Sequence, residues 1–457
     1  MNLFTPTDTR PVHFVGIGGA GMSALALIAC RRGVVVSGCD TDPSGAADLA
    51  AMGARIWQGH DPAHLDGARA VVVTAAVASG NAELDRARAL GVPVVPRKEA
   101  LAALIGAARS VAVSGTHGKT TTTVMTTEAL AAAGLAPTGI AGGRVSGWGG
   151  NARLAGDDLF VVEADEYDKA FLTLHPTVAI VNNVEPDHLE CYGSMAALES
   201  AFVEFAGRAE TAVVSADDPG ARLIATRLPR APRLFGFADD ADVRITEVVQ
   251  RADRTEATIV WRGGRALPVR LRVPGVHNLR NAVAALAATD AIGGDVTRAA
   301  AALAEFGGVG RRFERLGEHG GIAVVDDYAH HPSELVATLA AARQAYPGRR
   351  LVAVFQPHLY SRTAAHGQAM GEALAAADLV VVTEVYAARE QPLEGVSGRQ
   401  VVDAARRAGA DARFEPSRAD VGRRVYEVLA PGDVVLTLGA GDITRVGPEL
   451  VRWLDAA

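Results

Sequence analysis

Cysteine is scarce and an excess of positive charge is absent in this chain of 457 residues. It has three cysteines, an odd number without C-x-x-C spacing, which supports neither a disulfide framework nor a structural zinc site of the usual cysteine pattern. Its 45 lysines and arginines are outnumbered by 52 aspartates and glutamates, so the net charge is -7. This balance gives no indication of a nucleic-acid-binding protein.

Long apolar runs are missing as well. No stretch reaches the roughly 18–20 residues that span a bilayer. The N-terminus, MNLFTPTDTRPVHFVGIGG, has no basic patch followed by a long apolar core. We therefore expect a cytoplasmic protein without membrane insertion. Alanine and valine are abundant in a composition that is 49% hydrophobic, which indicates helices packed on buried strands.

Short β-branched runs alternate with Ala- and Leu-rich stretches from end to end, a pattern typical of parallel sheets with crossover helices. The pattern restarts near Ala107, and again after GVGRRFERLGEHGG. With about 100–200 residues per domain, these restarts predict three α/β domains, residues 1–107, 108–314 and 315–457. Period-two alternation over residues 242–275 predicts antiparallel strands added to the edge of the middle sheet.

A phosphate-binding loop is predicted in VAVSGTHGKTTTTV, residues 111–124. Gly115 and Gly118 let the backbone turn its amides toward an anion after the strand ends and before a helix opens. Lys119 and Thr120 then suit a phosphate contact and a Mg²⁺ ligand. Only two residues separate the glycines, whereas the common phosphate loop has four between them.

The next two strands end in polar side chains: Glu163, Asp165 and Glu166 after the first, and Asn183, Glu185, Asp187 and His188 after the second. Ligands of open α/β sheets bind outside the carboxyl ends of the strands, so we expect these side chains to surround whatever the lysine loop holds. Carboxylate oxygens and a neutral imidazole beside phosphates are suitable Mg²⁺ ligands.

The last third of the chain repeats this arrangement. The runs IAVVDDYAHHPSE, LVAVFQPHLYSRT, LVVVTEVYAARE and VVLTLGAGDI are predicted strands that end in polar or glycine-rich residues. At this second sheet edge His330, His331, His358 and Arg362 are candidates for binding a carboxylate, and capping or packing is the alternative for each histidine. An edge that binds nucleotide phosphates and an edge that binds a carboxylate suggest that ATP drives the joining of two substrates.

A glycine-rich loop is predicted near the N-terminus. Gly16, Gly18 and Gly21 follow a strand in G-x-G-x-x-G register, with Asp40 about 20 residues further on. This pattern alone would indicate NAD, but the same glycines accommodate any diphosphate at a helix N-terminus.

Taken together, these motifs resemble the ATP-dependent Mur ligases of peptidoglycan synthesis. The matching segments occur in order along nearly the whole chain: GIGGAGMS, GTHGKTTTT, EADEYDKAFL, NNVEPDHLECY, HNLRNAVAALA, RRFERLG, DDYAHHPSE, FQPHLYSRT and GAGDI. The shortened lysine loop is the form that this family uses. The resemblance implies an N-terminal Rossmann-like UDP-binding domain, a central P-loop ATPase-like domain with a mostly parallel sheet plus antiparallel edge strands, and a C-terminal Rossmann-like domain that binds an amino acid.

The resemblance also implies an activity. It points to a ligase that joins L-alanine to the carboxylate of UDP-N-acetylmuramate through an acyl phosphate, using ATP and Mg²⁺, with Mn²⁺ as a substitute. A monomer or weak homodimer is expected. Three alternatives stay open: a recycling ligase that attaches a whole tripeptide, against which the GIGGAGMS loop argues, a regulator that binds ATP without ligating, and a dehydrogenase.

Residue roles follow from the resemblance where the residues match. For ATP it implies Gly115, Thr116, His117, Gly118, Lys119, Thr120, Thr121, Asn278, Asn281, Arg312 and Asp326. For the sugar nucleotide it implies Gly16, Gly18, Gly19, Gly21, Met22, Ser23 and Asp40, with Thr74, His60 and Asn81 as further candidates. The implied metal ligands are Thr120, Glu163 and His188, the implied alanine site is Tyr328, His330 and Arg362, and the implied catalytic set is Lys119, Glu163, His188, His330 and Arg362.

Two of these assignments have stated alternatives. Asn278 and Asn281 would otherwise cap the Ala-rich helix that follows them. Many relatives carry an arginine where this chain has Leu359, so we expect capture of the alanine carboxylate to depend more on Arg362.

Overall fold

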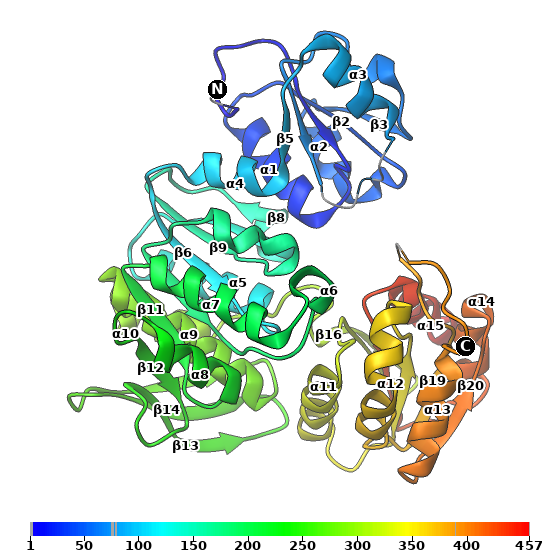
Figure 1. The fold of residues 1–457 in the computed structure, drawn as a ribbon. Helices are drawn as coiled ribbons and strands as arrows, with labels where there is room; N and C mark the ends of the chain where they lie inside the picture. Colours follow the sequence, from blue (N-terminus) through cyan, green and yellow to red (C-terminus); the bar gives the residue numbers. More distant parts are fainter. Residues whose placement is uncertain (1–2, 75–76, 78–79, 389, 457) are drawn as a thin grey trace. The chain divides into compact units, whose positions relative to one another are not determined.

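The computed structural model describes residues 3–74, 77, 80–388 and 390–456. In Figure 1 the chain forms three sheets, the first in blue, the second in cyan to green and the third in yellow to red. Within the described ranges, no helix is both long and apolar enough to cross a membrane. The chain divides into two compact units, the first of residues 1–247, 257–270 and 280–305, and the second of residues 248–256, 271–279 and 306–457.

The first sheet has five parallel strands in the order β3-β2-β1-β4-β5. The connections run in opposite directions from the fully buried β1, so a crevice for ligands is expected at its carboxyl end. The predicted Rossmann-like fold is confirmed. The elements are β1 (Val12–Val15), α1 (Ala20–Arg31), β2 (Val36–Asp40), η1 (Pro43–Ala46), α2 (Ala47–Ala51), β3 (Arg55–Gln58), η2 (Pro62–Leu65), β4 (Ala70–Val73), α3 (Ala82–Leu90), β5 (Val94–Pro96) and α4 (Arg97–Ile105).

The second sheet has ten strands in the order β15-β14-β13-β12-β11-β10-β6-β9-β7-β8. Strands were predicted between residues 242 and 275 at an edge of this sheet, and β13, β14 and β15 lie there. The antiparallel pair β7–β8 at the other edge was not predicted. The strands are β6 (Arg109–Ser114), β7 (Thr138–Val145), β8 (Gly150–Arg153), β9 (Leu159–Glu163), β10 (Val178–Val181), β11 (Thr211–Ser215), β12 (Arg233–Gly236), β13 (Val243–Gln250), β14 (Thr255–Trp261) and β15 (Ala266–Leu271).

The helices between these strands begin with α5, which follows the phosphate loop. Its run of threonines is a poor helix former, but the buried hydroxyls of Thr126 and Thr127 donate to the carbonyl oxygens of Thr122 and Thr123, at 2.7 and 2.8 Å. The threonines are therefore accommodated inside the domain. The helices are α5 (Lys119–Ala132), η3 (Ser146–Trp148), η4 (Tyr167–Thr173), α6 (Leu189–Tyr192), α7 (Met195–Arg208), α8 (Pro219–Arg227), α9 (Val276–Ile292) and α10 (Val296–Leu303).

The third sheet has six strands in the order β16-β17-β21-β18-β19-β20. All neighbours are parallel except β16 and β17, so the carboxyl ends of the four predicted functional strands meet at one edge. The elements are β16 (Glu314–His319), β17 (Ile322–Asp327), α11 (Pro332–Ala345), β18 (Leu351–Phe355), α12 (Tyr360–Leu374), β19 (Leu379–Val382), α13 (Gly398–Arg407), β20 (Asp411–Phe414), α14 (Arg418–Tyr426), β21 (Val434–Leu438), η5 (Asp442–Arg445) and α15 (Val446–Asp455).

Gln344 on α11 connects two further segments to the C-terminal sheet. Its Oε1 accepts from Gln250 Nε2 at 2.9 Å and from the backbone N–H of Gly275 at 3.0 Å. Its Nε2 donates to the carbonyl of Arg251 and to Thr255 Oγ1, both at 3.0 Å. The turn between β13 and β14 and the segment before α9 therefore belong to the same compact unit as α11.

Candidate functional site

The carboxyl ends of β10, β6 and β9 lie side by side in the second sheet. Val181 pairs with Ser114, and Val113 pairs with Glu163, so the three strands end at nearly the same level. The prediction that the lysine loop and the acidic strand ends share one edge is confirmed in its geometry.

The phosphate loop requires both of its glycines. Gly115 has a φ of 134°, and a Cβ there would lie 3.0 Å from the Cβ of Asn182. Gly118 has a φ of 78°, and a Cβ there would lie 2.8 Å from Asn281 Oδ1. Both positions combine a left-handed backbone with a close neighbour, which only glycine tolerates. The same contact places Asn281 directly beside the loop.

The segment after β10 holds the loop in shape. The backbone N–H of His117 donates to Asn183 Oδ1 at 2.7 Å, and the backbone N–H of Glu185 donates to Thr116 Oγ1 at 2.9 Å. His117 Nε2 also lies 3.1 Å from a carboxylate oxygen of Glu185. Asn183 and Glu185, predicted to surround the bound phosphate, are thus contacts within the loop in this structure.

Lys119 lies at the centre of the group. Its ammonium donates to both carboxylate oxygens of Glu166 at 2.9 Å and to the carbonyl oxygen of Gly115 at 2.7 Å. Burial alone would lower the pKa of Lys119, but the carboxylates of Glu166, Asp165 and Glu163 outweigh it and raise that pKa. The lysine is therefore a permanent positive charge.

Glu163 and His188 lie near this pair, Glu163 close to Lys119 and His188 close to Glu166. Glu163 accepts from the backbone N–H of Gly142, where a Cβ would lie 2.7 Å from its other oxygen, so glycine makes room for the carboxylate. His188 precedes α6 with a φ of 53°, and its ring lies edge-on to Tyr167 at 5.1 Å. Burial raises the pKa of Glu166, and His188 is close enough to oppose that rise.

The predicted metal ligands supply one hydroxyl, one carboxylate and one imidazole. Thr120 lies in the first turn of α5, Glu163 ends β9, and His188 follows β10. Oxygen donors with a neutral imidazole beside a phosphate loop suit a hard divalent cation. The residues present therefore fit magnesium.

The glycine-rich loop of the first sheet is held by Asp40. The backbone N–H of Gly18 donates to Asp40 Oδ2 at 2.9 Å, and the N–H of Asp42 donates to Oδ1 at 3.0 Å. Gly19 is the N-cap of α1, so the loop leads into a helix N-terminus as predicted, where backbone amides favour a diphosphate. Gly16 has a φ of 85°, and a Cβ there would meet the Thr74 side chain at 2.7 Å.

Met22 and Ser23 lie in the first turn of α1, directly after this loop, and their backbone N–H groups donate to the carbonyl of Gly19. Both are buried, and Ser23 Oγ accepts from Asn151 Nδ2 at 3.1 Å while donating to the carbonyl of Ala20. These contacts connect α1 to β8.

Arg97 was missed by the sequence analysis. A Cβ on Gly21 would lie 2.7 Å from Arg97 Nη1, and Nη2 is 3.7 Å from a carboxylate oxygen of Asp165. The guanidinium therefore lies between the start of α1 and the phosphate edge. Its position directly after β5, at the carboxyl edge of the first sheet, is the signal that could have revealed it.

The third sheet brings five side chains together, and four of them were predicted candidates. The His330 ring lies 5.3 Å from that of Tyr328 and 5.9 Å from that of His358. Arg362 Nη1 is 3.4 Å from His358 Nδ1, and the arginine is only 8% exposed. Tyr386, which the sequence analysis did not select, stacks on His358 at 5.8 Å.

His331 and Leu359 have structural roles nearby. His331 is the N-cap of α11, which is the capping alternative considered for it. Leu359 is buried with a φ of 68°, and it is the N-cap residue of α12 immediately before Tyr360. The left-handed backbone places strain at the turn that presents Arg362.

Asp326 and Arg312, both predicted to contact ATP, have different partners in this structure. Arg311 Nε lies 3.4 Å from Asp326 Oδ2, which also accepts from Thr444 Oγ1 at 2.8 Å. The guanidinium of Arg312 lies 4.7 Å from the ring centroid of Tyr328.

Three other candidates have local partners. Asn278 Nδ2 donates to the carbonyl of Pro274 at 2.7 Å, and Asn81 is the N-cap of α3. His60 Nδ1 lies 3.0 Å from a carboxylate oxygen of Glu83.

Models of three known domains match the chain in order. They are the Mur ligase family catalytic domain at residues 11–109, the Mur ligase middle domain at 113–289, and the Mur ligase glutamate ligase domain at 311–441. The chain is 46% identical to a UDP-N-acetylmuramate–L-alanine ligase of Streptomyces griseus subsp. griseus, with 98% of both chains covered. It is 45% identical to a ligase of the same description from Burkholderia thailandensis, over 97% of this chain and 98% of that one.

Solved structures give the same picture. A UDP-N-acetylmuramate–alanine ligase of Thermotoga maritima matches with a TM-score of 0.85 and 31% identity, over 98% of this chain and 100% of that one. A murein peptide ligase of Psychrobacter arcticus matches with a TM-score of 0.74 and 26% identity, over 98% of this chain and 99% of that one.

Proposed function

The chain belongs to the Mur ligase family, and we propose that it joins L-alanine to the carboxylate of UDP-N-acetylmuramate with conversion of ATP to ADP and phosphate. The observation that carries the proposal is the group of Lys119, Glu163 and His188 at three adjacent strand ends. The near-complete coverage of relatives described as such ligases supports the choice of substrates.

Phosphoryl transfer depends on positioning and charge more than on covalent help from the protein. The backbone amides of the loop between Gly115 and Gly118 would bind the ATP phosphates. The Lys119 ammonium would stabilise the negative charge that develops on the phosphate oxygens during transfer. Thr120, Glu163 and His188 would hold Mg²⁺, which neutralises phosphate charge when bound. Mn²⁺ has the same preference for oxygen donors and would substitute.

In the reaction, a carboxylate oxygen of UDP-N-acetylmuramate attacks the γ-phosphorus of ATP, and the bond to ADP breaks. The resulting acyl phosphate is attacked at carbon by the amine of alanine, and the tetrahedral intermediate expels phosphate. The chain's residues orient the reactants at about 3–3.5 Å and exclude water from the acyl phosphate.

The alanine carboxylate would bind at the cluster of His330, His358 and Arg362. Arg362 supplies a planar guanidinium that can make a bidentate pair with a carboxylate. Its near-complete burial makes such a pair less screened by solvent. Tyr328 and Tyr386 border the imidazoles and restrict their orientation.

The UDP diphosphate would bind at the glycine-rich loop, where Gly18 and Gly19 lead into α1. Arg97 would add a positive charge beside Gly21. With ATP at the phosphate loop of the middle domain, this assigns one substrate to each domain, with boundaries near residues 107 and 314. We place the enzyme in the cytoplasm, because the substrates of this family are cytoplasmic metabolites. A monomer or weak homodimer is our expectation for its oligomeric state.

A ligase that attaches a whole tripeptide is the second candidate, because a murein peptide ligase has a similar structure. ADP release measured with ATP, UDP-N-acetylmuramate and a panel of amino acids and the tripeptide separates the two. We expect release with alanine and little with the tripeptide. Release with the tripeptide alone would overturn the proposal, and release without any amine would favour a nucleotide-hydrolysing regulator.

A further inference from the structure

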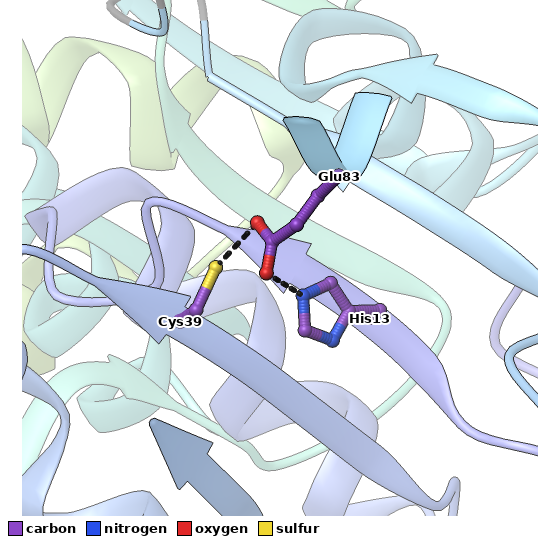
Figure 2. A group of neighbouring side chains, drawn as sticks. All are labelled: His13, Cys39 and Glu83. Atoms are coloured by element: carbon purple, nitrogen blue, oxygen red, sulfur yellow. Dashed lines mark hydrogen bonds and ion pairs between the residues drawn. The ribbon is translucent and has the colours of Figure 1, made fainter. Parts of the chain in front are cut away.

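A second group of ionisable side chains lies inside the N-terminal domain. His13 on β1, Cys39 on β2 and Glu83 on α3 are all 0% exposed. One nitrogen, the sulfur and one carboxylate oxygen lie within 4.8 Å of one another. Figure 2 shows the Glu83 carboxylate reaching between the Cys39 thiol and the His13 ring.

The His13–Glu83 separation has the length expected in a tetrahedral cation site, and the contacts of Cys39 are shorter. Cys39 Sγ is 2.9 Å from Glu83 Oε2, and His13 Nε2 is 3.7 Å from Oε1. His60 borders this three-residue group, because its Nδ1 is 3.2 Å from Cys39 Sγ and 3.0 Å from Glu83 Oε2. Metal–ligand bonds of about 2.0–2.3 Å in a tetrahedral zinc site place neighbouring ligands about 3.3–3.7 Å apart.

Outer contacts already orient these donors. His13 Nδ1 is 3.0 Å from Ser37 Oγ, which turns Nε2 toward Glu83. Among the residues that the structure describes, this buried Nε2 has no hydrogen-bond partner. His64 Nδ1 is 2.7 Å from Glu83 Oε1, and the His64 ring stacks on Trp57 at 4.5 Å. Such partners fix the tautomer and orientation of metal ligands.

The cluster carries a buried negative charge. The Glu83 carboxylate is fully buried, and it faces the Cys39 thiol and the rings of His13 and His64. A buried carboxylate requires a positive charge nearby. That charge is either an imidazolium or a bound cation.

We propose that His13, Cys39 and Glu83 form a binding site for a divalent cation of the zinc class, with His60 at its border. Sulfur, nitrogen and a single carboxylate are the donors of a borderline-soft cation, whereas Mg²⁺ prefers oxygen alone. On binding, the Cys39 S–H bond breaks, its proton passes to solvent, and a sulfur–metal bond forms. The His60 side chain, 28% exposed, provides the route of entry.

An occupied site would stabilise the glycine-rich loop. Cys39 directly precedes Asp40, whose carboxylate accepts from the N–H of Gly18, and the carbonyl of Cys39 accepts from the N–H of Gly16 at 2.8 Å. His13 lies on the strand that leads into the same loop. The site is independent of the proposed ligase activity, since cation binding is measured without substrates.

Cobalt titration of the full-length chain, first stripped with a chelator, tests the proposal. We expect one equivalent of Co²⁺ to give a near-ultraviolet thiolate-to-cobalt band that excess Zn²⁺ removes and millimolar Mg²⁺ does not. Cys39→Ser should abolish the band. Cys30→Ser and Cys191→Ser, which change half-buried thiols outside the cluster, should retain it.

A milder substitution provides a second measurement. Ser37→Ala removes the partner of His13 Nδ1 and should weaken Zn²⁺ affinity about 10- to 100-fold, whereas Ser200→Ala on α7 should leave it unchanged. Absence of the cobalt band, its persistence in Cys39→Ser, or a Zn²⁺ affinity within twofold of the parent in Ser37→Ala would each overturn the proposal. If Cys39→Ser does not fold, the Ser37→Ala affinity decides.

Discussion

The ammonium of Lys119 lies 2.9 Å from both carboxylate oxygens of Glu166. In this arrangement the lysine contacts its own loop and an acid at the end of a neighbouring strand. A bound nucleotide offers the ammonium phosphate oxygens, so phosphate and Glu166 compete for the same charge. The site therefore holds its main cation in place before substrate arrives.

Replacing Lys119 by alanine should reduce turnover about 10²- to 10³-fold, as loss of a positioned transition-state donor does. The reason is that the lysine contacts a phosphate whose charge shifts during transfer. Steady-state ADP release measures the effect, and Lys169→Ala, at an exposed lysine, is the control. Near-normal turnover in a folded Lys119→Ala variant would refute the role of the loop.

Substitutions of Lys119 and Glu166 should have non-additive effects on the free energy of unfolding. Glu166→Gln leaves a buried ammonium without its partner and should lower the free energy of unfolding by about 3–5 kcal/mol. The double variant Lys119→Met/Glu166→Gln should lose less than the sum of the single variants. Urea denaturation of the four proteins measures this. Additive losses would show that the two charges do not interact.

Activity should depend strictly on Mg²⁺ or Mn²⁺. Glu163→Gln and His188→Ala each remove a proposed ligand, so both should lose turnover sharply and need more Mg²⁺ for half-maximal rate. The control is Glu204→Gln, an acid on α7 that is half exposed. Full activity in the presence of EDTA, or an unchanged Mg²⁺ requirement in both variants, would contradict the assignment.

Arg362→Lys should raise the KM for alanine far more than the KM for ATP. A lysine keeps the charge but not the planar fork, and loss of a charge-assisted pair in a buried site is worth about 1.5–3 kcal/mol, or roughly 10- to 150-fold. Leu359→Ala should act mainly through packing, since Leu359 is buried. Arg399→Lys is the control. An alanine KM within twofold of the parent would move the carboxylate site to His330 and His358.

Stability should fall as the pH rises through the range in which Asp327 titrates. Burial raises the pKa of Asp327 from 3.8 to about 6, although the charge of Arg312 and hydrogen bonds from the N–H groups of Ala329 and Phe313 oppose this rise. Between these values the folded protein binds more protons than the unfolded chain, so ionisation destabilises the fold by about 3 kcal/mol above pH 6. The stability difference between the parent and Asp327→Asn should therefore change between pH 4 and 6.5. A constant difference would exclude the shift.

The meeting of Gly115, Glu163 and His188 could be predicted because adjacent parallel strands bring their carboxyl ends to one edge. The sequence could not tell which polar side chains face the ligand. Asn183 and Glu185 follow the same strand as His188 but bind the loop instead, and this depends on backbone angles beyond the strand.

Contacts between elements that are far apart in the chain could not be predicted from the sequence either. Arg97 reaches Gly21 from a different strand end, and Tyr386 stacks on His358 from a loop after β19. Cys39 and Glu83 lie 44 positions apart without any ligand-spacing motif. Each pairing depends on the packing of whole elements, which periodicity does not encode.

The four hydrogen bonds of Gln344 determine which fragment of the chain contains a complete C-terminal unit. A fragment that starts at residue 315 would contain the whole of α11 and its sheet but would lack Gln250, Thr255 and Gly275. Its Gln344 amide would then lose all four partners, and a surface shaped to cover the turn after β13 would be uncovered. An excised C-terminal piece should accordingly be less stable and more prone to associate than its intact sheet suggests, whereas cleavage that leaves both pieces together should be tolerated.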